Sequence, residues 1–132
     1  MKLIVFVAAL AMTLPRIAFA QNLDGNSLLE ACESPAEQGL ALFCSGYIMG
    51  VVEGLKWGSA STLVAIGTES SAAELNELSN NLLGYCTPPE AQFRQLQDIA
   101  INYLLAHPEQ RHESARSMLL LAFRQAYPCP PL

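Results

Sequence analysis

The apolar positions of this 132-residue chain recur mostly at three- and four-residue steps, and no run alternates long enough to form a convincing strand. Helical spacing predicts helices over 26–33, over about 38–57, from Ser71 to Gly84, over about 87–106 and from Pro108 to Ala126. The apolar face of the second helix is formed by Leu40, Cys44, Tyr47, Ile48, Val51 and Leu55. The pattern therefore predicts an all-α fold, a small bundle of about five helices.

Capping residues mark where several of these helices begin and end. Asn26 or Ser27 can cap the first helix. Ser71 and Glu74 form a capping box, and Gly84 suits the C-terminal cap of the same helix.

The next helix is expected to start at Thr87 as its cap, with Pro88 in the first helical position and Glu90 in the third. Pro108 is expected to end that helix and to begin the following one.

The segment from Trp57 to Thr68 separates the second and third predicted helices. It contains an apolar run that includes Leu63 and Ile66, bounded by small polar residues. We interpret the segment as a connecting loop with an apolar tip. A surface loop of this kind is also a candidate contact site.

Three glycines, Gly46, Gly50 and Gly54, recur every four residues in the second helix. Each costs about 1 kcal/mol relative to alanine in a helix interior, so the stripe calls for a reason. The favoured interpretation is close approach of another helix; a flexible helix or a dimer interface are the alternatives. A membrane-spanning pair is disfavoured, because Glu53 and Lys56 interrupt the apolar run.

The N-terminus has the organisation of a signal peptide. Lys2 precedes twelve apolar residues over 3–14, Pro15 follows, and residues 18–20 read Ala-Phe-Ala, a cleavage site. Twelve residues are too few to cross a bilayer, which takes roughly 20. The sequence predicts a signal peptide over 1–20 and one exported domain over 21–132, with no membrane insertion after cleavage.

The four cysteines, Cys32, Cys44, Cys86 and Cys129, are even in number and lie in a small exported domain. This setting predicts two disulfides. Spacings of 12, 42 and 43 positions lack the close pairs of a thiolate metal site, so we expect no metal and no other cofactor. Three pairings are possible; we prefer Cys32–Cys44 with Cys86–Cys129, because each pair brackets a compact helical unit.

Composition and charge exclude several classes of protein. A hydrophobic content of 52% with 14% charged residues excludes a disordered chain. The formal net charge is −5, and removal of Lys2 and Arg16 leaves five basic residues against twelve acidic ones, or −7. A chain this acidic disfavours nucleic-acid binding.

No constellation of residues predicts catalysis. His107 and His112 are five positions apart, roughly 140° around a helix, and so do not share a face as paired zinc ligands do. Ser114 lies in no nucleophile elbow. The paired carboxylates resemble solvated helix faces. We therefore expect a binding or structural protein and not an enzyme.

Three sequence blocks resemble one known family. Their most specific parts are Cys44-x-Gly46-Tyr47, His107-Pro108-Glu109-x-Arg111-His112 and Tyr127-Pro128-Cys129-Pro130. Over about 26–130 the chain is similar to the type VI amidase immunity and resistance-associated proteins (Tai/Rap). The resemblance implies a periplasmic helical protein that binds and blocks a peptidoglycan amidase delivered by type VI secretion, often as a homodimer.

We therefore expect an immunity protein whose partner is an amidase effector. The alternative is a periplasmic stress or chaperone-type protein, or a structural one, that keeps the same fold without a toxin. For a protein partner, the first candidate apolar anchors are Trp57, Leu63 and Ile66.

Overall fold

The computed structural model describes residues 22–131, which contain five α-helices, one 3-10 helix and no β-strand. The elements are α1 (Gly25–Glu33), α2 (Gly39–Ala65), α3 (Ala72–Leu83), α4 (Phe93–Ala106), η1 (Pro108–Gln110) and α5 (Ala115–Ala126). This confirms the predicted all-α fold of about five helices. The predicted signal peptide lies outside the described residues.

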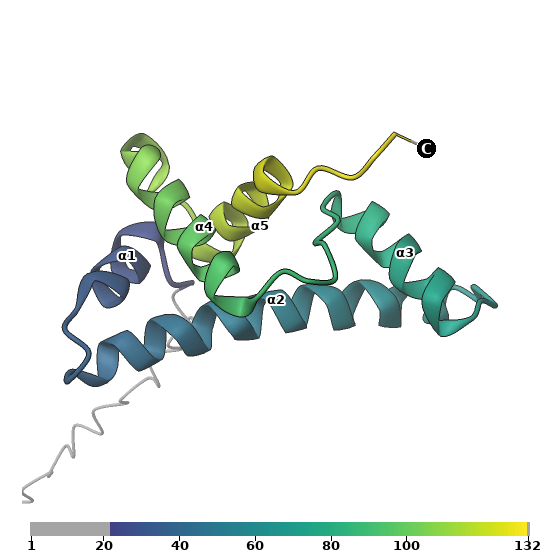
Figure 1. Ribbon diagram of the computed structural model, residues 1–132, viewed down its shortest axis with the longest axis horizontal. Coiled ribbons are helices and arrows are strands. Elements are labelled where there is room, and N and C mark those ends of the chain that lie inside the picture. Colours follow the sequence, from purple (N-terminus) through teal and green to yellow (C-terminus); the bar gives the residue numbers. More distant parts are fainter. Residues whose placement is uncertain (1–21, 132) are drawn as a thin grey trace, which may run out of the picture.

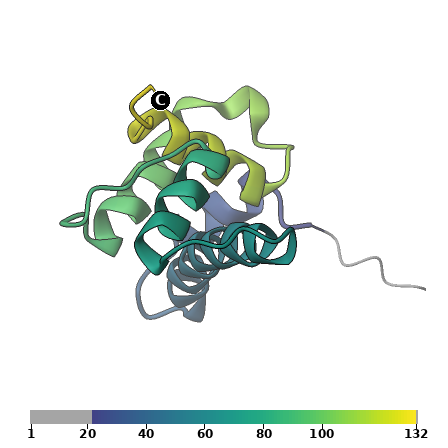
Figure 2. The same ribbon diagram turned by 90° about the vertical axis from the view of Figure 1, so that its right-hand side faces the viewer.

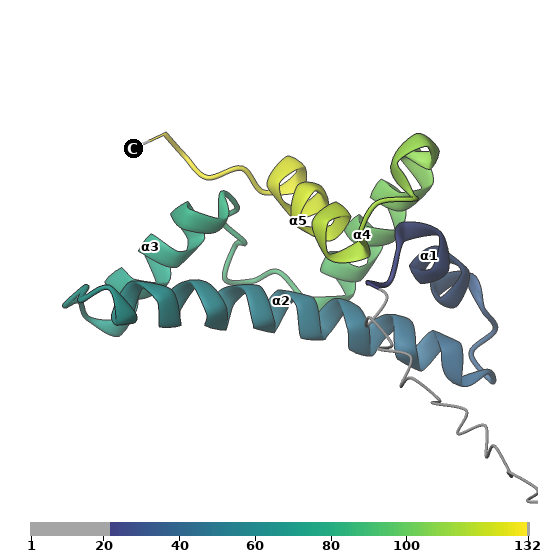
Figure 3. The same cartoon turned by 180° about the vertical axis from the view of Figure 1, so that it is seen from behind.

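Helix α2 is the central element of the fold, and the other α-helices pack on it. Its 27 residues span roughly 40 Å. Figures 1 and 3 show the other helices on one side of it, with α1 over its first turns, α4 and α5 over its middle and α3 over its last turns. The view along α2 in Figure 2 shows the same one-sided arrangement.

The hydrophobic core lies where α1, α4 and α5 meet the first half of α2. Fully buried side chains from all four helices pack together there. The largest are Leu28, Ile48, Leu104, Met118, Leu119 and Phe123. Tyr85, which follows α3, is also fully buried, and its ring centroid lies 5.6 Å from that of Phe123.

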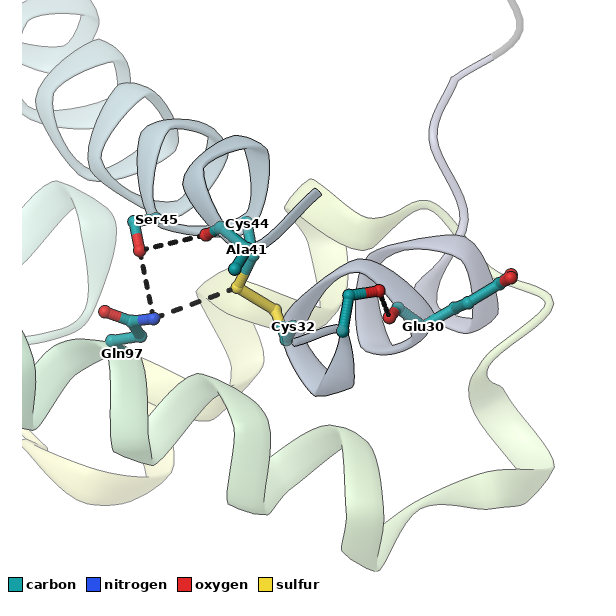
Figure 4. The surroundings of a disulfide bond; sticks show 7 residues. Glu30, Cys32, Ala41, Cys44, Ser45 and Gln97 are labelled. Carbon is teal, nitrogen blue, oxygen red and sulfur yellow. Dashed lines mark hydrogen bonds between the residues drawn. A yellow bond between two sulfur atoms is a disulfide. The ribbon is translucent and has the colours of Figure 1, made fainter. Parts of the chain in front are cut away.

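Two disulfides crosslink segments that border this core. The pairs are Cys32–Cys44 and Cys86–Cys129, which confirms the preferred pairing. Figure 4 shows the first bridge between α1 and α2, where Gln97 of α4 donates a hydrogen bond of 3.1 Å to Ser45 Oγ. The second bridge joins the segment after α3 to the C-terminal tail.

The capping residues of α3 are as predicted, but the cap of α1 is not. Ser71 and Glu74 form the capping box, and Gly84 closes α3 with a left-handed φ of 77°. Asp24, in place of Asn26 or Ser27, caps α1: its carboxylate accepts a 2.8 Å hydrogen bond from the Ser27 N–H. That hydrogen bond lowers the pKa of Asp24.

Helix α4 begins later than predicted. Its first residue is Phe93, so the expected start at Thr87 is wrong. Pro89 disfavours helical dihedrals at Pro88, and this prevents a continuous helix through the pair. The Gln95 side chain accepts a 2.7 Å hydrogen bond from the Gln92 N–H and fixes the actual start.

Helix α2 continues beyond its predicted end, so the expected loop at 57–68 is wrong over 57–65. The hydroxyls of Ser59 and Thr62 donate to the carbonyls of Lys56 and Gly58, at 2.9 and 2.8 Å. Because both hydroxyls bond to carbonyls of the same helix, they do not stabilise a non-helical backbone conformation. The helix stops only before Gly67, whose φ is 85°.

The glycine stripe of α2 does not receive another helix of this chain. No described atom outside the local backbone lies within 4 Å of a Cβ added at Gly46, Gly50 or Gly54. The predicted close packing within the chain is therefore wrong, because the stripe faces away from the other helices. By length and composition α2 is apolar enough to cross a membrane, although it also contacts α1, α3, α4 and α5.

Candidate functional site

The hairpin formed by α2 and α3 exposes apolar side chains. Helix α3 packs mainly on the second half of α2, and the turn between them spans residues 66–71. Trp57 is 78% exposed, and Ile66 is 73% exposed. On α3 and the second half of α2, the other large apolar side chains that are exposed are Val64, Leu78 and Leu82. Contiguous exposed apolar surface of this kind marks sites of interaction.

A pocket of about 350 Å³ lies among these side chains. We call it the hairpin pocket, and its lining residues are Trp57, Ala60, Ser61, Val64, Ala65 and Leu75. Its walls are almost wholly apolar. A concave apolar site with an exposed tryptophan at its edge fits an apolar side chain of a protein partner.

The three candidate anchors lie in different surroundings. Trp57 lines the hairpin pocket, whereas Leu63 and Ile66 do not. Leu63 is half-buried on α2, and Ile66 is exposed one residue after α2 ends. The structure therefore brings only Trp57 to the pocket.

Five residues of the pocket were not predicted from the sequence, and Val64 and Leu75 are the largest of them. Trp57 and Val64 are seven positions apart, a spacing that shares a face only in a helix. This spacing is visible in the sequence. It indicates a shared face only in a helix, however, and the sequence predicted a loop over this segment. Leu75 joins them through the packing of α3 on α2.

The charged residues of the hairpin are mainly acidic. Between positions 53 and 84 the chain carries four glutamates and one lysine: Glu53, Lys56, Glu69, Glu74 and Glu77. Lys56 Nζ is engaged, because it donates a 2.7 Å hydrogen bond to Asn80 Oδ1 and lies 5.6 Å from the Tyr85 ring centroid. Burial lowers the pKa of Lys56. A hairpin with this excess of acidic residues suits a partner that carries basic groups.

Polar contacts hold α3 in place behind this surface. Arg124 Nε of α5 donates a 2.6 Å hydrogen bond to the Leu83 carbonyl, which closes the C-terminal end of α3. Cys129 Sγ approaches the Asn80 carbonyl at 3.6 Å. Burial raises the pKa of Tyr85 to about 12, so its ring stays neutral beside Lys56. These contacts orient the hairpin while leaving its apolar side chains exposed.

The histidines and Ser114 do not form a catalytic set. The Nδ1 atom of His107 lies 3.3 Å from a Glu109 oxygen, and the centroid of the His107 ring lies 4.2 Å from that of the tilted Tyr103 ring. His112 is exposed beside Glu113. The Ser114 hydroxyl is buried with no hydrogen-bond partner among the described residues. In that same range no three His, Cys, Asp or Glu side chains are grouped to hold a metal ion.

Arg111 has a structural role that the sequence did not indicate. Its Nε donates a 2.7 Å hydrogen bond to the Leu104 carbonyl, and its terminal nitrogen donates to the Leu105 carbonyl at 3.2 Å. These carbonyls lie at the C-terminal end of α4 and have no partners within the helix. Arg111 therefore belongs to the scaffold.

A family model of the Rap1a immunity proteins matches residues 24–129. The chain belongs to this family. The match confirms the resemblance to type VI immunity proteins. No curated protein and no solved structure matches the chain significantly.

Both disulfides and the whole hairpin pocket lie inside the region that matches the Rap1a immunity proteins. Immunity proteins bind a cognate effector, and such families are generally non-enzymatic. A surface that binds another protein is therefore expected on this Rap1a immunity protein.

Proposed function

We propose that this protein acts in the periplasm, where it binds and inhibits a peptidoglycan amidase delivered by type VI secretion. Two disulfides support an oxidising compartment, and the predicted signal peptide supports export. Membership of an immunity family supports an effector as the partner. The protein acts by occupying the amidase and takes no part in chemistry.

The observation that carries the proposal is the exposed apolar surface at the hairpin, with Trp57 at the edge of its pocket. Tryptophan is among the residues that most often dominate binding energy at protein interfaces. Trp57 is therefore the proposed principal anchor, and Ile66 and Leu63, which lie outside the pocket, are the further candidates. The acidic residues of the hairpin would pair with basic groups on the amidase.

A homodimer is also part of this proposal, since the family resemblance implies one. The free protein would then meet the effector as a pair of identical chains. Each copy would present its own hairpin pocket.

Calorimetry between the mature protein and the proposed amidase effector tests the proposal. We expect a tight complex that Trp57→Ala weakens about 30-fold or more, the effect of losing a dominant contact. Leu121→Ala is the matched control, because Leu121 is 43% exposed on α5 and lies outside the hairpin. It should leave the affinity unchanged, and neither variant should lower the melting temperature.

Deletion of the gene tests the proposed function in cells. A deletion strain should lyse beside a neighbour that delivers the amidase, and the wild-type gene should restore survival. Normal survival, together with no complex with any encoded amidase, would reject the immunity role and favour a periplasmic stress or chaperone-type protein.

A further inference from the structure

The two halves of α3 differ in how much of each is covered. Six of the seven residues over 72–78 are exposed, and Leu75 is the exception. Over 79–85, by contrast, Leu82 is the one exposed residue. Figures 1 and 3 show the first turns of α3 beside the end of α2, away from α1, α4 and α5. The first half of α3 is therefore held to the protein mainly by Leu75.

Three contacts fix the second half of α3. Lys56 Nζ of α2 donates a 2.7 Å hydrogen bond to Asn80 Oδ1. Arg124 Nε of α5 donates one of 2.6 Å to the Leu83 carbonyl. The Cys86–Cys129 disulfide crosslinks the segment that follows the helix. The C-terminal end of α3 is therefore a fixed point.

The turn between α2 and α3 can change its shape without loss of packing. Five of the six residues over 66–71 are exposed. Gly67 lies near the start of the turn with a φ of 85°, and glycine has the widest choice of backbone conformations. Because α3 has 12 residues and is roughly 18 Å long, a small tilt at its fixed end displaces its first turn by several ångströms.

The seam where α3 packs on the second half of α2 is partly polar. Ser59 and Ser79 are buried there, and the Ser79 hydroxyl has no hydrogen-bond partner within residues 22–131. A buried hydroxyl without a partner is less stable than one that is hydrated. Burial also lowers the pKa of Lys56, because it disfavours the charged ammonium. These polar groups limit how strongly the closed position of α3 is favoured.

Leu63 lies on the face of α2 that α3 covers. It follows Lys56 by seven residues, so at about 100° per residue the two lie only about 20° apart around the helix. Lys56 is bonded to Asn80 of α3. Leu63 is accordingly half-buried, whereas Trp57 and Val64 are exposed. Displacement of α3 would add Leu63 to this exposed apolar surface.

We infer that α3 is a lid on the hairpin pocket, which tilts about its C-terminal end and in its open position adds Leu63 to the surface that receives the effector. Leu75 moves with the lid and widens the pocket, whose other lining residues all belong to α2. The open position exposes apolar side chains, so a partner that covers them shifts α3 toward it. The identity of that partner rests on the proposed function, and the motion itself does not.

Distances between two spin labels in the mature protein, without any amidase, test the lid. One label is placed at Leu121→Cys of α5, and the other at Ala73→Cys or at Leu82→Cys, near the two ends of α3. All three side chains are exposed. Dilution into unlabelled protein restricts the measurement to pairs within one chain.

We expect two distances for the Ala73 label and a single distance for the Leu82 label. A single distance for both labels would overturn the inference, because α3 would then be rigid. Two distances for both would also overturn it, because the C-terminal end of α3 would then move as well.

Leu75→Ala should shift the balance toward the open position, and Leu78→Ala on the same helix is the matched control. Leu75 is the covered residue of the first half, whereas Leu78 is 40% exposed. Leu75→Ala should raise the ratio of the long to the short Ala73–Leu121 distance about fivefold or more, because it removes apolar contact that closes the lid. Leu78→Ala should leave the ratio unchanged. Equal ratios for the two variants would contradict the lid.

The proposed amidase effector, added in excess, should leave only the longer Ala73–Leu121 distance. An amidase that binds while the short distance remains would reject the lid and leave the proposed function standing. An amidase that does not bind, with two distances in the free protein, would reject the proposed function and support the motion of α3.

Discussion

The two ends of α2 differ in what covers them. Over its first half, α1, α4 and α5 surround a fully buried core that includes Leu28, Ile48 and Phe123. Over its last turns lies α3, and the buried side chains of α2 and α3 there are Ser59, Ser79 and Leu83. The first end is stabilised by apolar burial. The second depends on one disulfide, helix caps and a few polar contacts.

This difference explains how a small protein can expose so much apolar surface and still fold. The core end supplies the free energy of folding, since burial of apolar area is the main favourable contribution. The hairpin end can then keep Trp57 and Val64 exposed for a partner. Regions with few buried apolar contacts open locally at low free energy, so we expect the hairpin to adapt its shape to what it binds.

Removal of the disulfides should separate the two ends most clearly. The chain-entropy model gives about 4 kcal/mol for the loop closed by Cys86–Cys129 and about 3 kcal/mol for that closed by Cys32–Cys44. The double variant Cys86→Ala with Cys129→Ala should speed hydrogen exchange throughout α3. Loss of the other bridge should leave α3 protected, and it serves as the control. Equal exchange in α3 for the two variants would mean that the hairpin is not separately fixed.

Two leucines, one in the core and one on α3, should differ in how much they stabilise the protein. Leu104 is fully buried in the core, whereas Leu82 of α3 is 55% exposed. Leu104→Ala should lower the free energy of unfolding by about 2–5 kcal/mol, because it removes packed methyl groups and leaves a cavity. Leu82→Ala should change it by less than about 1 kcal/mol. Urea denaturation measures both, and similar losses would show that the core extends into the hairpin.

Two glycines should respond in opposite directions to alanine. A Cβ at Gly25 would lie 2.5 Å from Met118 Sδ and 3.1 Å from the Arg111 Cα, so Gly25→Ala should cost about 1–3 kcal/mol through overpacking. A Cβ at Gly58 meets nothing within 4 Å. Gly58→Ala should therefore stabilise by up to about 1 kcal/mol through helix propensity. Thermal melts would show one midpoint falling and the other rising; two falling midpoints would contradict the open environment of Gly58.

The smallest effect concerns the pH dependence contributed by Asp24. The Ser27 N–H lowers the pKa of this carboxyl below its usual value of 3.8. The stabilisation is therefore fully present at neutral pH and is lost as the pH falls through the folded-state pKa. At pH 7, Asp24→Ala should cost about 1 kcal/mol as a lost helix cap. The difference from the wild type should shrink in melts below about pH 4, and a constant difference would contradict this cap.

The elements stabilised by local interactions could be predicted from the sequence. The capping box at Ser71 and the left-handed Gly84 depend only on residues within one helix. The disulfide pairing followed from compact units along the chain. The end of α2 could not be predicted in this way, because serine and threonine have weak helix propensity. Here the hydroxyls of Ser59 and Thr62 donate to carbonyls three and four residues earlier in the same helix.

The candidate site was predictable only in part for a related reason. The exposure of Trp57 was anticipated, but its neighbours in the pocket depend on α2 continuing to Ala65 and on Leu75 packing beside it from α3. The glycine stripe was expected to pack inside the chain. Its spacing indicates close helix contact, but spacing alone does not tell whether that contact lies within one chain or between two.

Inhibition of the proposed effector is the most direct test of immunity. Purified peptidoglycan is digested by a peptidoglycan amidase delivered by type VI secretion, the proposed effector, while mature protein is added in increasing ratio. We expect hydrolysis to fall to background near one chain of this protein per amidase, and Trp57→Ala to shift the curve to much higher concentration. Undiminished hydrolysis at large excess of the wild-type protein would contradict the immunity role.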